Sequence, residues 1–465
     1  MKQIRQSLCG LRTVLLLNWL ALLSAGAAPT NAPSAGARSS PAWLRQAVVY
    51  EIFPRNFSQS GDFNTITASL DKLKDLGADI LWLMPIHPSG QKMKKGTLGS
   101  PFAVRDYRAV NPDYGTADDF KRLVAGAHQR GMKVILDIVA GHTSWDSVLM
   151  SHPEFYKRDK DGHIFPPNPG WPDVVALDYD NQELRQYMIE MLKDWVKDFG
   201  VDGFRGDVAF TRPTEFWEEA RIELEKINPE IILLADANAA PALLAKAFNM
   251  DNSGALNSAV NRVMSGIAPA YLLDRSWENT RQQFPEGALH LRFTDNHESV
   301  RAVARFGLPG ALAAQVLMLT LDGVPLFYNG MEVGDTTESA DPALFEKLPV
   351  YWTPGGRPAL REIYRSLIKL RKAHPAFYND SVVWLQNTAP AEIIALQRKD
   401  DQEEFVVLIN FSSRPVSGSV ELPAAEEFSL LKIDGMPTLP QSALPEFRLD
   451  GYEWRIYHRT IAKKN

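Results

Sequence analysis

The chain has 465 residues, of which 45% are hydrophobic and 23% are charged. These fractions are close to those of ordinary globular proteins, so the composition excludes a chain that is disordered throughout. The formal net charge is −6, and this acidic balance argues against a partner recognised through the phosphate backbone of a nucleic acid. The length favours two domains over one.

Residues 1–27 are predicted to form a secretory signal. Lys2, Arg5 and Arg12 precede an apolar run over 14–23, and four small residues follow, which is the pattern of a cleaved signal peptide. We therefore expect a periplasmic or extracellular protein, with an uncleaved membrane anchor as the alternative. No later apolar run is expected to be long enough to span a membrane. The single cysteine, Cys9, leaves with the signal, so the mature chain has no disulfide.

A flexible leader is predicted over 28–41, which is rich in Ala, Pro, Ser and Gly. Beyond it, short apolar runs alternate with patterns of helical spacing, such as those of 182–199 and 213–227. Repeated strand–helix order indicates a parallel sheet covered by helices. We predict an α/β fold, a (β/α)8 TIM barrel over 42–378. The runs expected to be its buried strands are 48–53, 80–84, 134–139, 203–205, 231–235, 289–294 and 324–328.

Two parts of the chain depart from this alternation. Residues 143–178 contain four prolines within 166–172 and are too long and irregular for a simple connection, so they predict a loop excursion after the third strand. After residue 378, short alternating runs at 382–385, 393–397, 405–409 and 417–422 replace the helical patterns. They predict an antiparallel C-terminal β-sandwich domain over 379–465.

Polar residues directly follow several of the predicted strands, at 137–142, 205–207, 236 and 295–298. In a barrel of parallel strands, the carboxyl ends of the strands open onto one mouth, and active sites lie at that mouth. We therefore expect these four groups of residues to converge on a single site.

The ordered series of motifs resembles glycoside hydrolase family 13, the α-amylase family, across nearly all of 43–460. The resemblance implies retaining cleavage of α-1,4-glucans or maltooligosaccharides, with such a glucan as the partner and no nucleic acid. The matching runs are Gly99–Tyr107 (GSPFAVRDY), Asn111–Thr116 (NPDYGT), Gly131–His142 (GMKVILDIVAGH), Gly203–Asp207 (GFRGD), Ile231–Asp236 (IILLAD) and Phe293–Glu298 (FTDNHE).

Three catalytic residues are implied by this resemblance. Asp207 matches the nucleophile, and Arg205 matches the arginine that supports the nucleophile's carboxylate. Asp236 stands where the family has a glutamate acid/base, and Glu298 stands where it has an aspartate that stabilises the transition state. The two carboxylates keep their charge while their side-chain lengths are exchanged.

The remaining implied site residues bind the sugar. His142 and His297 match the histidines that donate to the sugar ring, and Phe102 stands where a tyrosine usually stacks on it. Gly141 occupies the position of an asparagine that the family uses as a calcium ligand. Since that oxygen ligand is missing and no dense Asp/Asn loop replaces it, we predict no essential metal and no other cofactor.

Retaining cleavage needs a nucleophilic carboxylate and a protonated carboxylic acid, with the two groups about 5 to 5.5 Å apart. Asp236 is one methylene shorter than the glutamate it replaces, so its carboxyl group is expected to lie farther from Asp207. We expect slower hydrolysis for this reason, and a faster reaction in an Asp236→Glu variant.

Other functions stay open at this stage. A glucosyltransferase or isomerase uses the same glucosyl-enzyme intermediate and differs only in the acceptor. A catalytically silent α-glucan-binding protein has the same fold, because fold does not fix function. Structural roles are also compatible with the sequence: Arg205 and Asp207 as a buried ion pair, and Asp236 and Glu298 as a helix cap and a salt-bridge partner.

Overall fold

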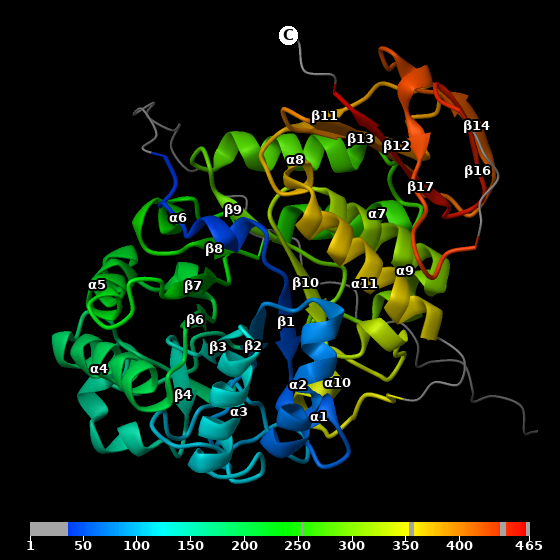
Figure 1. Cartoon of the computed structure of the whole chain (residues 1–465). Helices are drawn as coiled ribbons and strands as arrows, with labels where there is room; N and C mark the ends of the chain where they lie inside the picture. Colours follow the sequence, from blue (N-terminus) through cyan, green and yellow to red (C-terminus); the bar gives the residue numbers. More distant parts are fainter. Residues whose placement is uncertain (1–35, 238, 253, 353–357, 438–442, 462–465) are drawn as a thin grey trace, which may run out of the picture. The chain divides into compact units, whose positions relative to one another are not determined.

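The protein is described by a computed structural model, which covers residues 36–237, 239–252, 254–352, 358–437 and 443–461. The predicted signal over 1–27 lies outside the described residues, as does most of the predicted leader. Within the described part, eight parallel strands close into a barrel in the order β1-β10-β9-β8-β7-β6-β3-β2 (Figure 1). The strands are β1 (Val49–Ile52), β2 (Ile80–Leu83), β3 (Lys133–Ile138), β6 (Gly203–Gly206), β7 (Ile232–Ala235), β8 (Met250–Asp251), β9 (Leu289–Arg292) and β10 (Val324–Tyr328).

The predicted TIM barrel is thereby confirmed, and seven of its strands were expected from the sequence. The eighth, β8, escaped prediction because it has two residues, fewer than any apolar run that marks a strand. It is nevertheless paired on both sides, with Ala235 opposite Asp251 and Met250 opposite Leu289.

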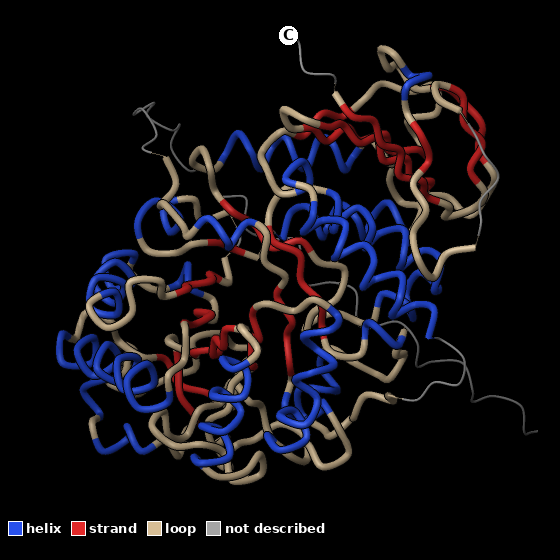
Figure 2. Tube along the Cα trace, in the orientation of Figure 1, coloured by secondary structure: helices blue, strands red, loops and turns tan. Residues whose placement is uncertain are grey.

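Helices surround the barrel on its outer side (Figure 2). The segment predicted over 182–199 is α4 (Gln182–Phe199), where Asn181 accepts hydrogen bonds from the first free N–H groups. The apolar residues of α4 recur at helical spacing and are buried against the strands. The other helices are α1 (Pro54–Phe57), α2 (Phe63–Leu76), α3 (Ala117–Gln129), α5 (Thr214–Glu225), α6 (Ala242–Lys246), α7 (Gly254–Met264), α8 (Leu272–Gln283), α9 (Ala302–Thr320), α10 (Asp341–Phe345) and α11 (Pro358–Ala373).

The segment after β3 leaves the barrel and returns to it. It begins with β4 (His142–Ser144), which pairs in antiparallel fashion with β5 (Val174–Ala176). The backbone N–H of Leu177 then donates to the carbonyl of Gly141 across 3.1 Å. The excursion is therefore tied to the barrel mouth at both of its ends.

The C-terminal part is antiparallel, as the alternating runs predicted. A five-stranded sheet has the order β11-β12-β13-β17-β15, and β14 pairs with β16 in a second sheet. The sequence did not reveal β15, β16 or β17. The strands are β11 (Val382–Trp384), β12 (Ile393–Lys399), β13 (Glu403–Asn410), β14 (Val416–Ser419), β15 (Ser429–Leu430), β16 (Glu446–Leu449) and β17 (Trp454–Thr460).

The helix α9 corrects one expectation. Among the described residues it is the one helix long and apolar enough to cross a membrane by length and composition, whereas no such run was expected after the signal. Most of its side chains are buried within the protein, and its regular geometry is broken at Gly307, where φ is 69° and ψ is 167°. A core helix of a soluble protein has the same composition.

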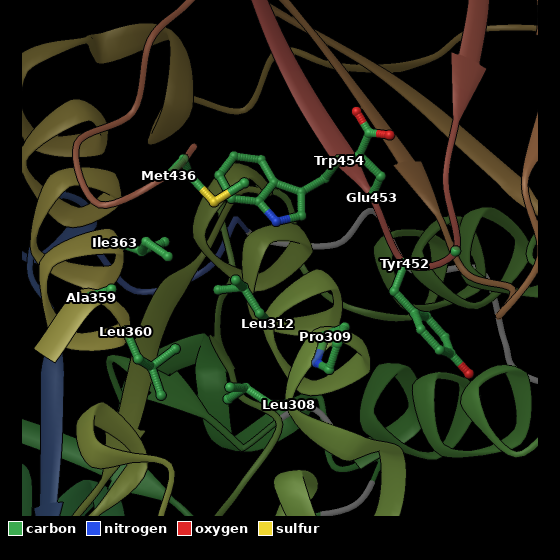
Figure 3. Close-up of a pocket in the computed structure, with 11 residues that line it drawn as sticks. Leu308, Pro309, Leu312, Ala359, Leu360, Ile363, Met436, Tyr452, Glu453 and Trp454 are labelled. Carbon is green, nitrogen blue, oxygen red and sulfur yellow. The ribbon is translucent and has the colours of Figure 1, made fainter. Parts of the chain in front are cut away.

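An apolar cavity of about 320 Å³ lies where α9 and α11 meet β17. Figure 3 shows Trp454 and Met436 on one side of this cavity, facing Leu312 of α9 and Ile363 of α11. Its lining is mostly apolar, so the barrel helices and the C-terminal sheet face each other with carbon atoms at this junction.

A buried arginine binds several backbone carbonyls at the amino-terminal end of the barrel. Arg371 of α11 is 1% exposed, and its Nη1 atom donates to the carbonyls of Leu319, Leu321 and Phe377 at 2.6 to 3.0 Å. Its Nη2 atom donates to the carbonyl of Gly323, directly before β10, across 2.6 Å. The charge thereby satisfies carbonyls that would otherwise be buried without partners.

Candidate active site

Three aspartates share one arginine at the barrel mouth. Nη1 of Arg205 lies 2.9 Å from Oδ1 of Asp137 and 2.7 Å from Oδ1 of Asp207, while Nη2 lies 2.7 Å from Oδ2 of Asp236. The aspartates stand at the carboxyl ends of β3, β6 and β7, which are neighbours in the barrel. Backbone bonds from Asp207 to Ile138 and from Asp236 to Gly206 fix these ends.

This buried cluster contains three carboxyl groups and only one guanidinium, so its negative charges are not fully balanced. Burial raises the pKa of Asp207 to about 7, and the neighbouring carboxylates of Asp137, Asp236 and Glu298 add to the rise, although Arg205 opposes it. Burial likewise raises the pKa of Asp137, against the attraction of Arg205. The cluster therefore holds a proton near neutral pH, as a site for acid–base chemistry requires.

Asp236 is held by three groups. Its Oδ2 atom forms an ion pair with Nη2 of Arg205 at 2.7 Å and accepts from the backbone N–H of Val208 at 3.1 Å. Its Oδ1 atom accepts from Nδ2 of Asn252 at 2.6 Å. Asn252 was not predicted as a site residue, because it follows the strand β8 that the sequence did not reveal.

A second buried ion pair lies beside the cluster. Nδ1 of His297 is 2.5 Å from Oε1 of Glu51, and the two side chains are 1% and 0% exposed. Burial alone lowers the pKa of His297, but the charge and hydrogen bond of Glu51 outweigh it and raise the pKa to about 9. Glu51 was missed, although a glutamate within the apolar run 48–53 was the signal that could have identified it.

Glu298 occupies the open side of the site. Its side chain is 58% exposed, and its Oε1 atom lies 3.8 Å from Nε2 of His297. Phe102 is half-buried, with its ring 5.5 Å from the His297 ring at an interplanar angle of 33°. The guanidinium of Arg205 lies 6.0 Å from the centre of the same phenyl ring. An apolar ring face beside charged groups suits a sugar, which has both kinds of surface.

His142 completes the group of predicted residues. Its ring bonds to the backbone carbonyl of Phe102 and lies 5.7 Å from the ring of Trp171, in the excursion. Burial lowers the pKa of His142 to about 3, and the charge of Arg212 adds to this shift. This imidazole is therefore neutral, whereas that of His297 is charged. The structure brings all seven predicted site residues together.

The residues near Gly141 do not fit a calcium ion. A Cβ atom built on Gly141 would lie 3.5 Å from Cζ of Arg212, and this guanidinium lies 5.4 Å from the centre of the Tyr179 ring. A positive side chain thus already lies against this position, and a divalent cation prefers several oxygen ligands there. No group of three or more His, Cys, Asp or Glu side chains in the described part of the chain is arranged to hold a metal.

Comparison with known proteins identifies relatives over most of the chain. α-Amylase MalA of Haloarcula japonica is 27% identical over 413 residues, which are 83% of this chain and 58% of that protein. This chain therefore spans less than two thirds of MalA. α-Amylase 3 of Dictyoglomus thermophilum is 30% identical over 353 residues, 67% of this chain and 68% of that protein.

Solved structures agree with these relatives. The noncanonic maltogenic α-amylase AmyB of Thermotoga neapolitana superposes with a TM-score of 0.82 at 29% identity, over 90% of this chain and 100% of that one. An α-amylase from Lactobacillus plantarum gives 0.80 at 31% identity, over 89% and 99%. The family described as "Alpha amylase, catalytic domain" matches residues 51–162 and 170–349. Because this match covers more than half of the residues, the chain belongs to the α-amylase family.

Proposed function

We propose that this protein is an exported glycoside hydrolase that cleaves α-1,4-glucans or maltooligosaccharides with retention of configuration. The observation that carries the proposal is the cluster in which Arg205 binds Asp137, Asp207 and Asp236 at the mouth of the barrel. A cluster with one positive and three potentially negative groups supplies both an ionised nucleophile and a proton donor, which retaining cleavage needs.

In the first step, a carboxylate oxygen of Asp207 forms a bond to the anomeric carbon as the bond from that carbon to the leaving oxygen breaks. Asp236 transfers its proton to the leaving oxygen. In the second step, Asp236 removes a proton from water, the water oxygen bonds to the anomeric carbon, and the ester to Asp207 breaks. Arg205 stays bound to both carboxylates while their charges change.

The sugar at the point of cleavage is proposed to lie between the remaining side chains. Phe102 stacks on its apolar face, while His142, His297 and Glu298 form hydrogen bonds with its hydroxyl groups. His297 donates as a cation because its pKa is raised. His142 is neutral and uses its single N–H for the carbonyl of Phe102, so its other ring nitrogen accepts from a sugar hydroxyl.

The lengths of two carboxylate side chains set this chain apart from the family pattern that it resembles. Aspartate at 236 has less reach than glutamate, and glutamate at 298 has more reach than aspartate. We propose that cleavage of unactivated glucans is slower as a result, since general acid–base catalysis contributes about 10²- to 10⁴-fold.

A transferase reaction is the second candidate. Two relatives, each 25% identical over most of this chain, are named α-1,4-glucan:maltose-1-phosphate maltosyltransferases of Streptomyces coelicolor. Phe210, three residues after the proposed nucleophile in sequence, is 47% exposed, and an exposed aromatic ring is a surface on which a sugar acceptor can stack. Transfer changes only the acceptor in the second step, so it uses the same residues.

The test is incubation of the purified protein with maltoheptaose and with an aryl α-maltoside, beside an Asp207→Ala control. Cleavage of both substrates that is lost in the control supports the proposal, and the sizes of the products separate hydrolysis from transfer. Cleavage of the aryl substrate alone indicates a working nucleophile with a deficient acid. No cleavage of either leaves the silent glucan-binding protein as the function, and glucan affinity is then measured. Fractionation of the producing cells tests export.

A further inference from the structure

The orientation of the Asn252 side chain is fixed by its backbone neighbours. Asn252 directly follows β8, and its backbone N–H donates to the carbonyl of Ala235 across 3.2 Å. Its Oδ1 atom accepts from the backbone N–H of Ala237 at 3.2 Å. Since the amide oxygen is used in this way, the NH2 group faces Oδ1 of Asp236, at 2.6 Å.

The groups around Asp236 are divided unequally between its two oxygens. Oδ2 lies 2.7 Å from Nη2 of Arg205 and accepts from the backbone N–H of Val208, whereas Oδ1 accepts from Asn252. The positive guanidinium beside Oδ2 disfavours a proton on that oxygen, and Oδ1 keeps a second lone pair. A proton on Asp236 is therefore placed on Oδ1.

We propose that Asn252 is a positioning residue, which presents Oδ1 of Asp236 to the leaving oxygen of the substrate as the atom that carries the transferred proton. This inference rests on the proposed role of Asp236 as the acid/base. It assigns a task to a residue that belongs to none of the motifs by which the family resemblance was identified.

Arg205 gives the physical reason for such a residue. A guanidinium prefers to bind a carboxylate with both of its oxygens, and the terminal torsion of an aspartate rotates over a broad range. Without Asn252, both oxygens of Asp236 turn toward Arg205, and the proton donor is withdrawn from the substrate. The bond from Asn252 holds Oδ1 away from the arginine.

The same bond assists the proton transfer itself. As the Oδ1–H bond breaks, its electron pair stays on Oδ1, and the proton goes to the leaving oxygen, which takes the electron pair of its broken bond to carbon. Negative charge therefore develops on Oδ1, where the amide of Asn252 donates. Hydrogen bonds to charged groups are stronger than those to neutral groups, so this contact strengthens along the reaction.

The experiment compares Asn252→Ala with the unaltered chain on maltoheptaose and on an aryl α-maltoside. Because an aryl leaving group departs without a proton, we expect kcat/KM to fall about 10-fold on maltoheptaose and less than about 3-fold on the aryl substrate. Asn252→Ser keeps a donor hydroxyl and is expected to recover part of the loss; it also serves if the alanine variant does not fold. The matched control is Asn228→Ala, whose side chain accepts from Glu230 N at the other end of β7; it changes neither rate.

Two results overturn the inference. Equal losses on both substrates assign Asn252 to binding or to structure, and unchanged rates on both show that it positions nothing. An Asp236→Asn variant separates this failure from that of the proposed function. If Asp236→Asn spares the aryl substrate and Asn252→Ala does not discriminate, only the role of Asn252 is wrong. If Asp236→Asn cleaves both substrates at the unaltered rate, the acid/base assignment is wrong as well.

Discussion

His297 donates from Nδ1 to Oε1 of Glu51 across 2.5 Å, and neither side chain exposes more than 1% of its surface. A buried histidine without a counter-ion is neutral at neutral pH. Here the attraction of Glu51 overcomes burial, so the imidazole carries protons on both nitrogens. Its second nitrogen, Nε2, faces the open side of the site near Glu298. The residue that we place against the sugar is therefore an obligatory donor over most of the physiological pH range.

This pair makes the stability of the protein depend on pH. The pKa of His297 is about 9 in the folded chain and about 6.5 when unfolded. A raised pKa contributes stability that is complete below pH 6.5 and is lost as the pH rises through 9. Glu51→Gln should therefore lower the thermal midpoint most at pH 6, by the equivalent of at most about 3 kcal/mol, and hardly at pH 10.

Thermal unfolding between pH 6 and 10 measures this effect. Arg205 and Glu298 also act on His297 and are present in both proteins, so the difference between the two curves isolates Glu51. The control is Glu154→Gln, since Glu154 pairs with His152 at 3.1 Å on the surface and is expected to change little. A Glu51→Gln curve parallel to the original at every pH would contradict the charged His297.

Asp207→Asn should lower kcat by at least about 10³-fold on every substrate, because it removes the nucleophile. It should not lower the thermal midpoint. Asp207 competes with Asp137 and Asp236 for one guanidinium, and an amide at this place relieves the repulsion among them. Circular dichroism and a melting curve check the fold, and turnover of an aryl α-maltoside checks the chemistry. A variant that keeps its rate would refute the assignment of Asp207 as the nucleophile.

The rate should also depend on pH through Asp207. Burial raises its pKa to about 7, and the nucleophile has to be ionised. We therefore expect kcat/KM for an aryl α-maltoside to fall as the pH falls below about 7, by tenfold per unit at the low end. The profile measured with that substrate reports the nucleophile, because its leaving group needs no acid. A kcat/KM that stays level down to pH 5 contradicts the raised pKa of Asp207.

The contacts of Asp236 favour a different outcome for Asp236→Glu from the one that the sequence alone predicts. Restoring a glutamate there was expected to speed cleavage, since the family has glutamate. Asp236 is 8% exposed and bonds to Arg205, Val208 and Asn252, so an added methylene pushes the carboxyl group out of contact with these donors. These contacts predict that Asp236→Glu cleaves maltoheptaose more slowly than the unaltered chain. A faster variant shows that the neighbours rearrange around the longer side chain.

Metal removal should have no effect. The guanidinium of Arg212 lies against Gly141 and places a positive charge where the family's calcium ligand would stand. Dialysis against EDTA is expected to leave the thermal midpoint and the rate unchanged, and added calcium is expected to restore nothing. A midpoint that falls on chelation and recovers with calcium would show that a metal is bound elsewhere.

The sequence predicted those parts of the fold that have strong periodicity. The run 182–199 became α4 with the same bounds, since eighteen residues of helical spacing outweigh local variation. The strand β8 could not be predicted, because two residues carry no period. In the C-terminal sheet, β15 also has only two residues and could not be predicted for the same reason. Strand position there is set by pairing with β17, which is a property of the folded chain.

The site was predicted as far as recognisable motifs extend. The residues at the ends of β3, β6, β7 and β9 stand in such motifs, and they converge as expected of a barrel. Glu51 and Asn252 stand outside them, and their importance lies in what each one touches. A sequence motif identifies residues of an active site. It does not show which atoms those residues contact in the folded chain.

Arg371 anchors carbonyl groups at the end of the barrel remote from Asp207 and Asp236. Because these contacts lie at the amino-terminal end of the barrel, they do not constrain the side chains at the barrel mouth. Changes of side-chain length at 236 and 298 are therefore expected to leave the contacts of Arg371 intact, because no carbonyl bound by Arg371 contacts either residue. The contribution of Arg371 to thermal stability is therefore expected to stay the same in variants altered at the barrel mouth.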